Sequence, residues 1–388
     1  MAASQEDKAR PAKGDDPQLY LPREPVIIAL LSALAVVLFL AVTGLSRLYD
    51  AQQESLGNRW FARGVEDLQA QRFDRAAVEF RAALLYSRDD YSYQLNLAEA
   101  LLGLKRTNEA YAYLITLWDR QPEEGLVNLE LARIAVQQNE TDRALRYYHN
   151  AIYAAWPTDQ EGKRRDARLE LIEYLLRINA KTQAQAELIA LAANLGDDPA
   201  QQLQIGDLFV RAQDYEHALA AYRVALKSDR HNAAVLAGAG LAAFESGRYP
   251  VAYRYLQAAV TGNLNDAQSA ARLKTTELVL EMDPFQRQIS AEQRNRIVVK
   301  AFTAAGERLK GCSPPQSSAL PTAPPSLAES WEKMKPRITM AGLQRNPDLV
   351  EAAMDLVFNI ERQGSTVCGT LAGVDQALLL IAKLHEGS

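Results

Sequence analysis

The stretch GDLFVRAQDYEHALAAYRVAL, residues 206–226, decides the fold of this chain. Gly206 stands near its start, and Ala218 and Tyr222 stand in its second half, at positions where the two helices of a short hairpin would touch. A small side chain lets two helix axes approach closely, and a neighbouring ring fills the space that remains. The stretch therefore predicts a helix–turn–helix unit.

This pattern recurs along more than half of the chain at a constant period of 34 residues. The alanine of the second helix recurs at Ala76, Ala110 and Ala144 and, after an insertion of six residues, at Ala184, Ala218 and Ala252. Such a period is the signature of a repeat array, in which stacked units bury a continuous core. We expect residues 56–264 to form an all-α solenoid of about six units. The insertion WPTDQEGKRR, residues 156–165, predicts a longer loop between the third and fourth units.

The pattern resembles the tetratricopeptide-repeat (TPR) family, whose unit is a helix–turn–helix with small and large residues at these positions. The two best-matching units carry Gly206, Tyr215, Ala218, Tyr222 and Ala225, and Gly240, Gly247, Tyr249 and Ala252. The fourth unit departs from the pattern, because it lacks the glycine and the aromatic residue. The resemblance implies a chain that binds other proteins through the first helices of its units and catalyses no reaction.

The resemblance also places particular side chains on the concave face that the first helices would line. They are Asn58, Phe61, Val65, Gln69, Glu99, Arg133, Gln137, Glu173, Arg177, Asp207, Arg211 and Glu245. Such a groove would be mixed in charge with an apolar start, although each residue could equally be ordinary solvated helix surface. Chaperone-binding members of the family hold a terminal carboxylate with lysine and asparagine. The equivalent positions here hold Phe61, Val65 and Leu126, so that ligand class is not expected.

A membrane-spanning helix is expected over residues 26–46, which contain no charged residue. At ~1.5 Å per residue the segment crosses the ~30 Å hydrocarbon layer. A cleaved signal peptide is the main alternative, but its apolar region is shorter and ends at small residues. A buried soluble helix is the third interpretation. Lysine and arginine are slightly more numerous on the N-terminal side of this segment than directly after it, which favours a cytoplasmic N-terminus.

The remaining segments follow from composition. Residues 1–25 are polar and predict a disordered tail. Residues 265–312 predict capping helices, and residues 313–326, with five prolines, predict an extended linker, a Pro-rich peptide ligand being the alternative. Residues 327–388 predict a C-terminal helical segment with helices over 347–363 and 374–385.

The two cysteines, Cys312 and Cys368, bracket the Pro-rich segment. We expect a disulfide between them, with two buried free thiols as the alternative. A disulfide would place the domain in an oxidising compartment. Together with the charge asymmetry it favours a single-pass inner-membrane protein with a periplasmic repeat domain.

Composition and motifs exclude several classes of function. The net charge of -5 and the pI of about 5.6 lack the basic character of a nucleic-acid binder. No phosphate-binding, zinc-protease or serine-hydrolase motif occurs, so we expect no cofactor, metal or small-molecule substrate. The leading hypothesis is a membrane-anchored scaffold or assembly factor in envelope biogenesis, membrane-complex assembly or secretion. The alternatives are a permanent structural subunit of a membrane complex and an enzyme confined to the C-terminal segment. The sequence does not identify the partner.

Overall fold

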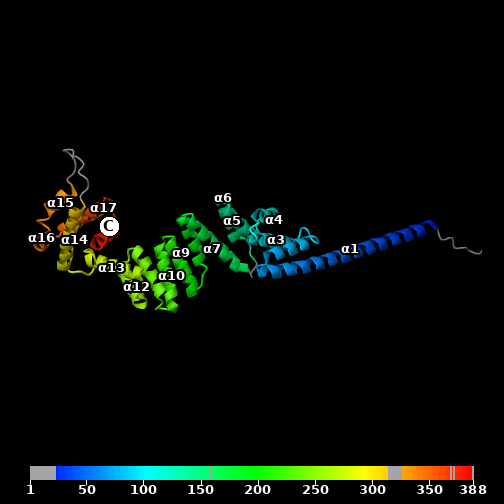
Figure 1. Cartoon of the computed structure of the whole chain (residues 1–388), viewed down its shortest axis with the longest axis horizontal. Helices are drawn as coiled ribbons and strands as arrows, with labels where there is room; N and C mark the ends of the chain where they lie inside the picture. Colours follow the sequence, from blue (N-terminus) through cyan, green and yellow to red (C-terminus); the bar gives the residue numbers. More distant parts are fainter. Residues whose placement is uncertain are drawn as a thin grey trace, which may run out of the picture. The chain divides into compact units, whose positions relative to one another are not determined.

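The computed structural model describes residues 23–154, 156, 160–312, 326–367, 369 and 372–386. All regular secondary structure in these ranges is helical (Figure 1). The expected tail up to residue 22, most of the expected linker and Cys368 lie outside the described residues. The chain divides into two compact units, residues 1–164 and residues 165–388. Each unit has a hydrophobic core of its own.

The described residues contain six consecutive helix–turn–helix hairpins. Their helices are α1 (Arg23–Gln69) with α2 (Phe73–Leu84), α3 (Tyr91–Gly103) with α4 (Thr107–Arg120), α5 (Gly125–Gln137) with α6 (Thr141–Tyr153), α7 (Glu161–Arg177) with α8 (Lys181–Ala192), α9 (Pro199–Arg211) with α10 (Tyr215–Ser228), and α11 (Ala233–Glu245) with α12 (Tyr249–Gly262). Acidic side chains cap the N-termini of two of the first helices. Asp90 accepts a hydrogen bond from the backbone N–H of Tyr93, and Asp198 accepts from that of Ala200, which satisfies amides that lack a partner within the helix.

The turn inside each hairpin repeats the same backbone geometry. One residue per turn has a positive φ, between 57° and 71°: Gln71, Lys105, Asn139, Asn179, Gln213 and Gly247. The following N–H returns to a carbonyl five residues earlier, as in Arg72 to Asp67 and Arg106 to Leu101. This is the Schellman ending of a helix. Only Gly247 is a glycine, so glycine content alone would not have located these turns.

Helix α1 is one continuous helix of 47 residues (Figure 1). It begins at Arg23, runs through the apolar segment expected at residues 26–46 and continues without a break to Gln69, where it forms the first helix of the first hairpin. Its apolar part is long enough to cross a membrane, and side chains such as Leu34 and Phe39 are exposed. The helix therefore does not break between the expected membrane segment and the first repeat.

The core of unit 1 lies between first and second helices. Phe80, Leu114 and Leu117 of the second helices are fully buried against Leu97 and Leu101. Gly64 of α1 faces Phe80 so closely that a Cβ at this position would lie 2.5 Å from the ring. The small-against-large pairing expected from the repeat pattern thus produces the helix contact.

The third hairpin ends in a way that corrects the expected loop over 156–165. Trp156 is buried, and its indole N–H donates a 2.7 Å hydrogen bond to the carbonyl of Ala151. Helix α7 then begins at Glu161, so residues 161–165 are helical. The loop prediction was wrong for this half, because charged residues in the first turns of a helix resemble a polar loop in sequence.

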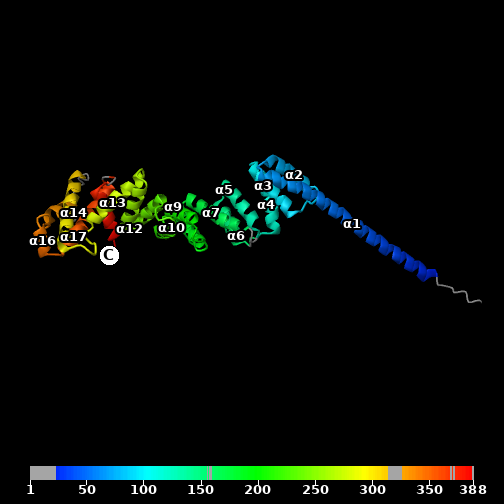
Figure 2. The same cartoon turned by 90° about the horizontal axis from the view of Figure 1, so that it is seen from below.

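Unit 2 contains the last hairpins and a second group of helices (Figure 2). These are α13 (Ala267–Met282), α14 (Ala291–Gly311), α15 (Leu327–Met334), α16 (Met340–Arg345), α17 (Leu349–Val367) and α18 (Val374–Leu384). They share one apolar core that includes Met282, Trp331 and Met354. The sequence did not predict the short helices α15 and α16. The indole N–H of Trp331 in α15 donates a hydrogen bond to the backbone carbonyl of Phe302 in α14. No local sequence pattern indicates this contact.

Candidate functional site

Most of the expected binding residues fall into two series on the first helices of the hairpins, at the repeat spacing. The first series is Val65, Glu99, Arg133, Glu173 and Asp207, and the second is Gln69, Gln137, Arg177, Arg211 and Glu245. Val65 and Arg133 are half-buried, and the other members are exposed. Because 34 residues return to the same place on successive units, each series follows the equivalent face of successive first helices within its unit.

The expected apolar start of this surface is occupied by packing within unit 1. The ring of Phe61 lies 5.7 Å from that of Phe80 and 5.0 Å from that of Tyr93. The Tyr93 hydroxyl donates a 2.8 Å hydrogen bond to the side-chain carbonyl of Asn58. Val65 packs against the same core. The structure thus brings Asn58 and Phe61 together as contacts between the first and second hairpins.

Two of the polar members in unit 1 contact polar side chains of the same unit. Arg133 contacts Glu130 one turn earlier at 2.5 Å, and the Gln137 side chain lies 3.5 Å from the Thr107 hydroxyl. Glu99 and Gln69 are exposed. These groups offer both charge signs to a ligand.

In unit 2 a member of the first series and a member of the second form an ion pair. Arg211 of α9 donates two hydrogen bonds of 2.7 Å to the carboxylate of Glu173 in α7. These bonds raise the pKa of Arg211 and keep it charged. Asp207 accepts a 2.7 Å hydrogen bond from the hydroxyl of Tyr222. Burial raises the pKa of this tyrosine well above its ordinary value, with the hydrogen bond to Asp207 as the second cause. The guanidinium of Arg177 lies 5.4 Å from the Tyr174 ring centre.

Helix α11 of the same unit presents small side chains. Ala234 is exposed, and Ala237 and Gly238 are partly exposed. A Cβ on Gly238 would lie 2.6 Å from the Tyr222 ring. These residues were not among the expected site residues, although the run AAVLAGAGLAAFE of α11 shows how small most of its side chains are. The glycine at position 238 therefore accommodates the Tyr222 ring.

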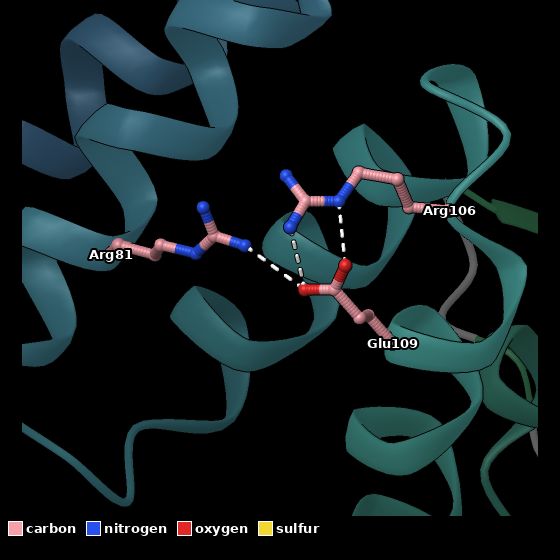
Figure 3. A network of polar contacts seen from close by, with 3 residues as sticks. All are labelled: Arg81, Arg106 and Glu109. Atoms are coloured by element: carbon pink, nitrogen blue, oxygen red, sulfur yellow. Dashed lines mark hydrogen bonds and ion pairs between the residues drawn. The ribbon is translucent and has the colours of Figure 1, made fainter.

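A charge cluster on the other helices joins the first two hairpins of unit 1 (Figure 3). Arg81 of α2 lies 3.2 Å from Glu109 of α4, and Arg106 contacts the same carboxylate at 2.6 Å. All three side chains are 40–48% exposed. The cluster links neighbouring repeats and was not among the expected site residues.

Two histidines of the hairpins, His149 and His217, lie against aromatic rings of their own hairpins. His217 lies 2.8 Å from Asp214 and stacks on Phe209, and His149 stacks on Tyr153. Among the described residues no group of three or more histidine, cysteine, aspartate and glutamate side chains is placed to hold a metal ion.

Comparison with known proteins agrees with the repeat geometry. Residues 203–270 match the family model described as Tetratricopeptide repeat. No curated protein matches the sequence significantly. The fold defines an all-α protein built from helix–turn–helix repeats. Within this fold, the segment from α9 to the start of α13 carries the tetratricopeptide repeat that the family model describes.

Several solved structures are similar at low sequence identity. YrrB, "a TPR protein with an unusual peptide-binding site", is 15% identical, with a TM-score of 0.39, over 49% of this chain and 95% of that one. Pseudomonas aeruginosa PilF is 15% identical, with a TM-score of 0.40, over 56% and 97%. PilW, a "widely conserved type IV pilus biogenesis factor", is 16% identical, with a TM-score of 0.38, over 57% and 98%.

Proposed function

We propose that this protein is a membrane-anchored scaffold or assembly factor that binds partner proteins through the exposed face of its first repeat helices. The observation that carries the proposal is the exposed pair Arg211–Glu173, in the unit that also contains the small-residue face of α11. Both side chains of the pair are about half exposed, at 49% and 50%. An exposed ion pair of this kind contributes only about 0–1 kcal/mol. A partner can therefore replace it with contacts of its own at little cost.

The chemistry of the surface favours a polar, extended peptide segment as the ligand. Arg177 and Arg211 offer donors to carboxylates and backbone carbonyls, while Glu173 and Asp207 accept from basic groups or backbone amides. The small residues of α11 leave room for a main chain. Phe61 and Val65 are used in packing, so the surface does not begin with an open apolar pocket.

The membrane part of the proposal rests on α1. Its apolar segment would anchor the chain in an inner membrane with the N-terminus in the cytoplasm and the repeats in the periplasm. An anchor raises the effective concentration of the binding surface near membrane partners. This supports a role in envelope biogenesis, membrane-complex assembly or secretion. Intact mass of the mature chain separates an anchor from a signal peptide, because cleavage would remove the segment.

The binding surface is tested by crosslinking in native membranes, followed by purification in gentle detergent and mass spectrometry. The test variant carries Arg177→Glu and Arg211→Glu. The matched control carries Arg223→Glu and Arg230→Glu, which reverse one exposed charge on the second helix α10 and one in the turn that follows it. We expect the test variant to lose partners that the control retains. Equal retention in both would rule out this face.

The second candidate function is a permanent structural subunit of a membrane complex. It predicts a stoichiometric partner that survives high salt and dilution, because obligate interfaces are larger and more apolar. A scaffold of exposed polar groups predicts a partner that dissociates as ionic strength rises.

A further inference from the structure

Helix α18 covers the end of the repeat array in unit 2. It packs against α13, the helix that follows the last hairpin, and also against α14 and α17. Ala377, Leu378 and Ile381 of α18 are fully buried, as is Met282 at the end of α13. Detachment of α18 would therefore expose an apolar face of α13.

Near the first turn of α18 lies a buried carboxylate. Glu361 of α17 is 0% exposed, and neither of its carboxylate oxygens has a hydrogen-bond partner among the described residues. Burying an ionised carboxylate without partners is strongly unfavourable, so such a group is held in its neutral form.

The charged groups around Glu361 come from the helices packed against α17. Asp375 of α18 acts on it with a like charge, and Arg308 of α14 acts with an opposite charge. The Arg308 guanidinium is shared, because it lies 4.0 Å from Asp375 and donates a 3.1 Å hydrogen bond to the carbonyl of Gly364. Glu307 of α14 acts on Asp375 in turn. Helix α15, which also packs against α17, contributes the buried Trp331.

The other end of α18 is held by contacts with the segment that follows α13. His385, directly after α18, lies 3.4 Å from Asp283, and its ring centre lies 4.7 Å from that of Phe285. A histidine–carboxylate contact is an ion pair only while the imidazole is protonated. The neighbouring ion pair Arg362–Glu386 has a distance of 2.9 Å. Leu384, the last residue of α18, lines a cavity of about 440 Å³ together with Phe285.

We propose that α18 is a proton-sensitive latch, which stays docked while the buried Glu361 is neutral and which is released as this carboxyl group loses its proton. The latch is independent of the membrane anchor and of the binding surface on the first helices.

The direction of the pH effect follows from Glu361. Burial, then the charge of Asp375, raises the pKa of Glu361 to about 8, against the small opposing effect of Arg308. An acid whose pKa is raised in the docked form stabilises that form most at low pH. The stabilisation is lost as pH rises from the ordinary value of 4.5 toward about 8. Across that window the equilibrium constant for release approaches a roughly tenfold rise per pH unit.

The test is amide hydrogen exchange of the full chain in detergent between pH 5.5 and 9, corrected for intrinsic exchange. We expect the α18 amides to lose protection as pH rises, while α17 keeps its protection. Glu361→Gln keeps the shape of the side chain and removes its ionisation. In this variant the α18 amides should stay protected at pH 8, with protection factors more than about tenfold higher than in the wild type. The control Glu351→Gln changes an exposed glutamate on the same helix and should behave as the wild type.

Protection of α18 that does not change with pH in the wild type would overturn the proposal. So would the same pH dependence in the Glu361→Gln variant. If that variant fails to fold, Asp375→Asn replaces it, because removal of the like charge beside Glu361 should reduce the pH dependence of α18. An unchanged dependence in Asp375→Asn would equally overturn the latch.

Discussion

Gly206 of α9 lies against the ring of Tyr222 in α10, so that a Cβ at position 206 would lie 2.6 Å from Cε1 of the tyrosine. The ring is almost fully buried, and its hydroxyl is held by Asp207. It cannot move aside without breaking that hydrogen bond. The glycine therefore sets how closely the two helices of this repeat approach.

Gly206→Ala is expected to destabilise unit 2 by roughly 1–3 kcal/mol, the usual cost of overpacking a close helix contact. Urea unfolding followed by circular dichroism measures the change. Gly196→Ala is the control, because a Cβ at that position meets nothing within 4 Å. We expect the control to lie within about 0.5 kcal/mol of the wild type. Equal effects of the two substitutions would contradict the packing argument.

The positive-φ turns predict stabilising substitutions. Gln213 has a φ of 62°, where a side chain is strained and glycine is not. Gln213→Gly should raise the free energy of unfolding by roughly 0.5–1 kcal/mol. The control Gln204→Gly lies inside α9 and should lower it by about 1 kcal/mol. The argument fails if both changes have the same sign in thermal or urea unfolding.

The charge cluster on unit 1 predicts a small, salt-dependent coupling. Glu109 contacts both Arg81 and Arg106, but all three are partly exposed. A double-mutant cycle of Arg81→Met and Glu109→Gln should give about 0.2–1 kcal/mol at low salt and less at 1 M salt. A parallel cycle of Arg81→Met with Glu123→Gln should give no coupling. Coupling well above this range would mean that the cluster is less hydrated than its exposure indicates.

The expected disulfide between Cys312 and Cys368 stays a prediction, because Cys368 lies outside the described residues. Cys312 is buried, and it lines a small cavity with Gly364 and Val367 of α17. If the bridge forms, its loop-entropy contribution is roughly 4 kcal/mol, so Cys312→Ser should lower the urea midpoint markedly. Alkylation with and without reductant, followed by intact mass, checks the bridge. Two thiols alkylated without reductant in protein taken from the periplasm would refute it.

Much of the repeat fold could be predicted from sequence because its contacts are local. Tyr222 meets Gly206 within one hairpin, so the pattern that specifies the contact fits in a window of about 20 residues. The first helices and their exposed positions followed from the same period. The packing of Phe61 against Tyr93 could not be predicted from the period. The period places a residue on a helix face, but it does not say which neighbouring side chain covers that residue.

By itself, the sequence determined the all-α repeat class, the hairpin register and an apolar segment long enough to cross a membrane. The tertiary structure decided that this segment and the first repeat helix are one continuous α1. It also decided how the C-terminal helices close over the end of the array. Arg308 bonds to Gly364 across 56 residues of sequence, and the buried Glu361 of α17 lies near charged groups of α14 and α18. No periodic pattern encodes such contacts, because they depend on where distant helices come to rest against one another.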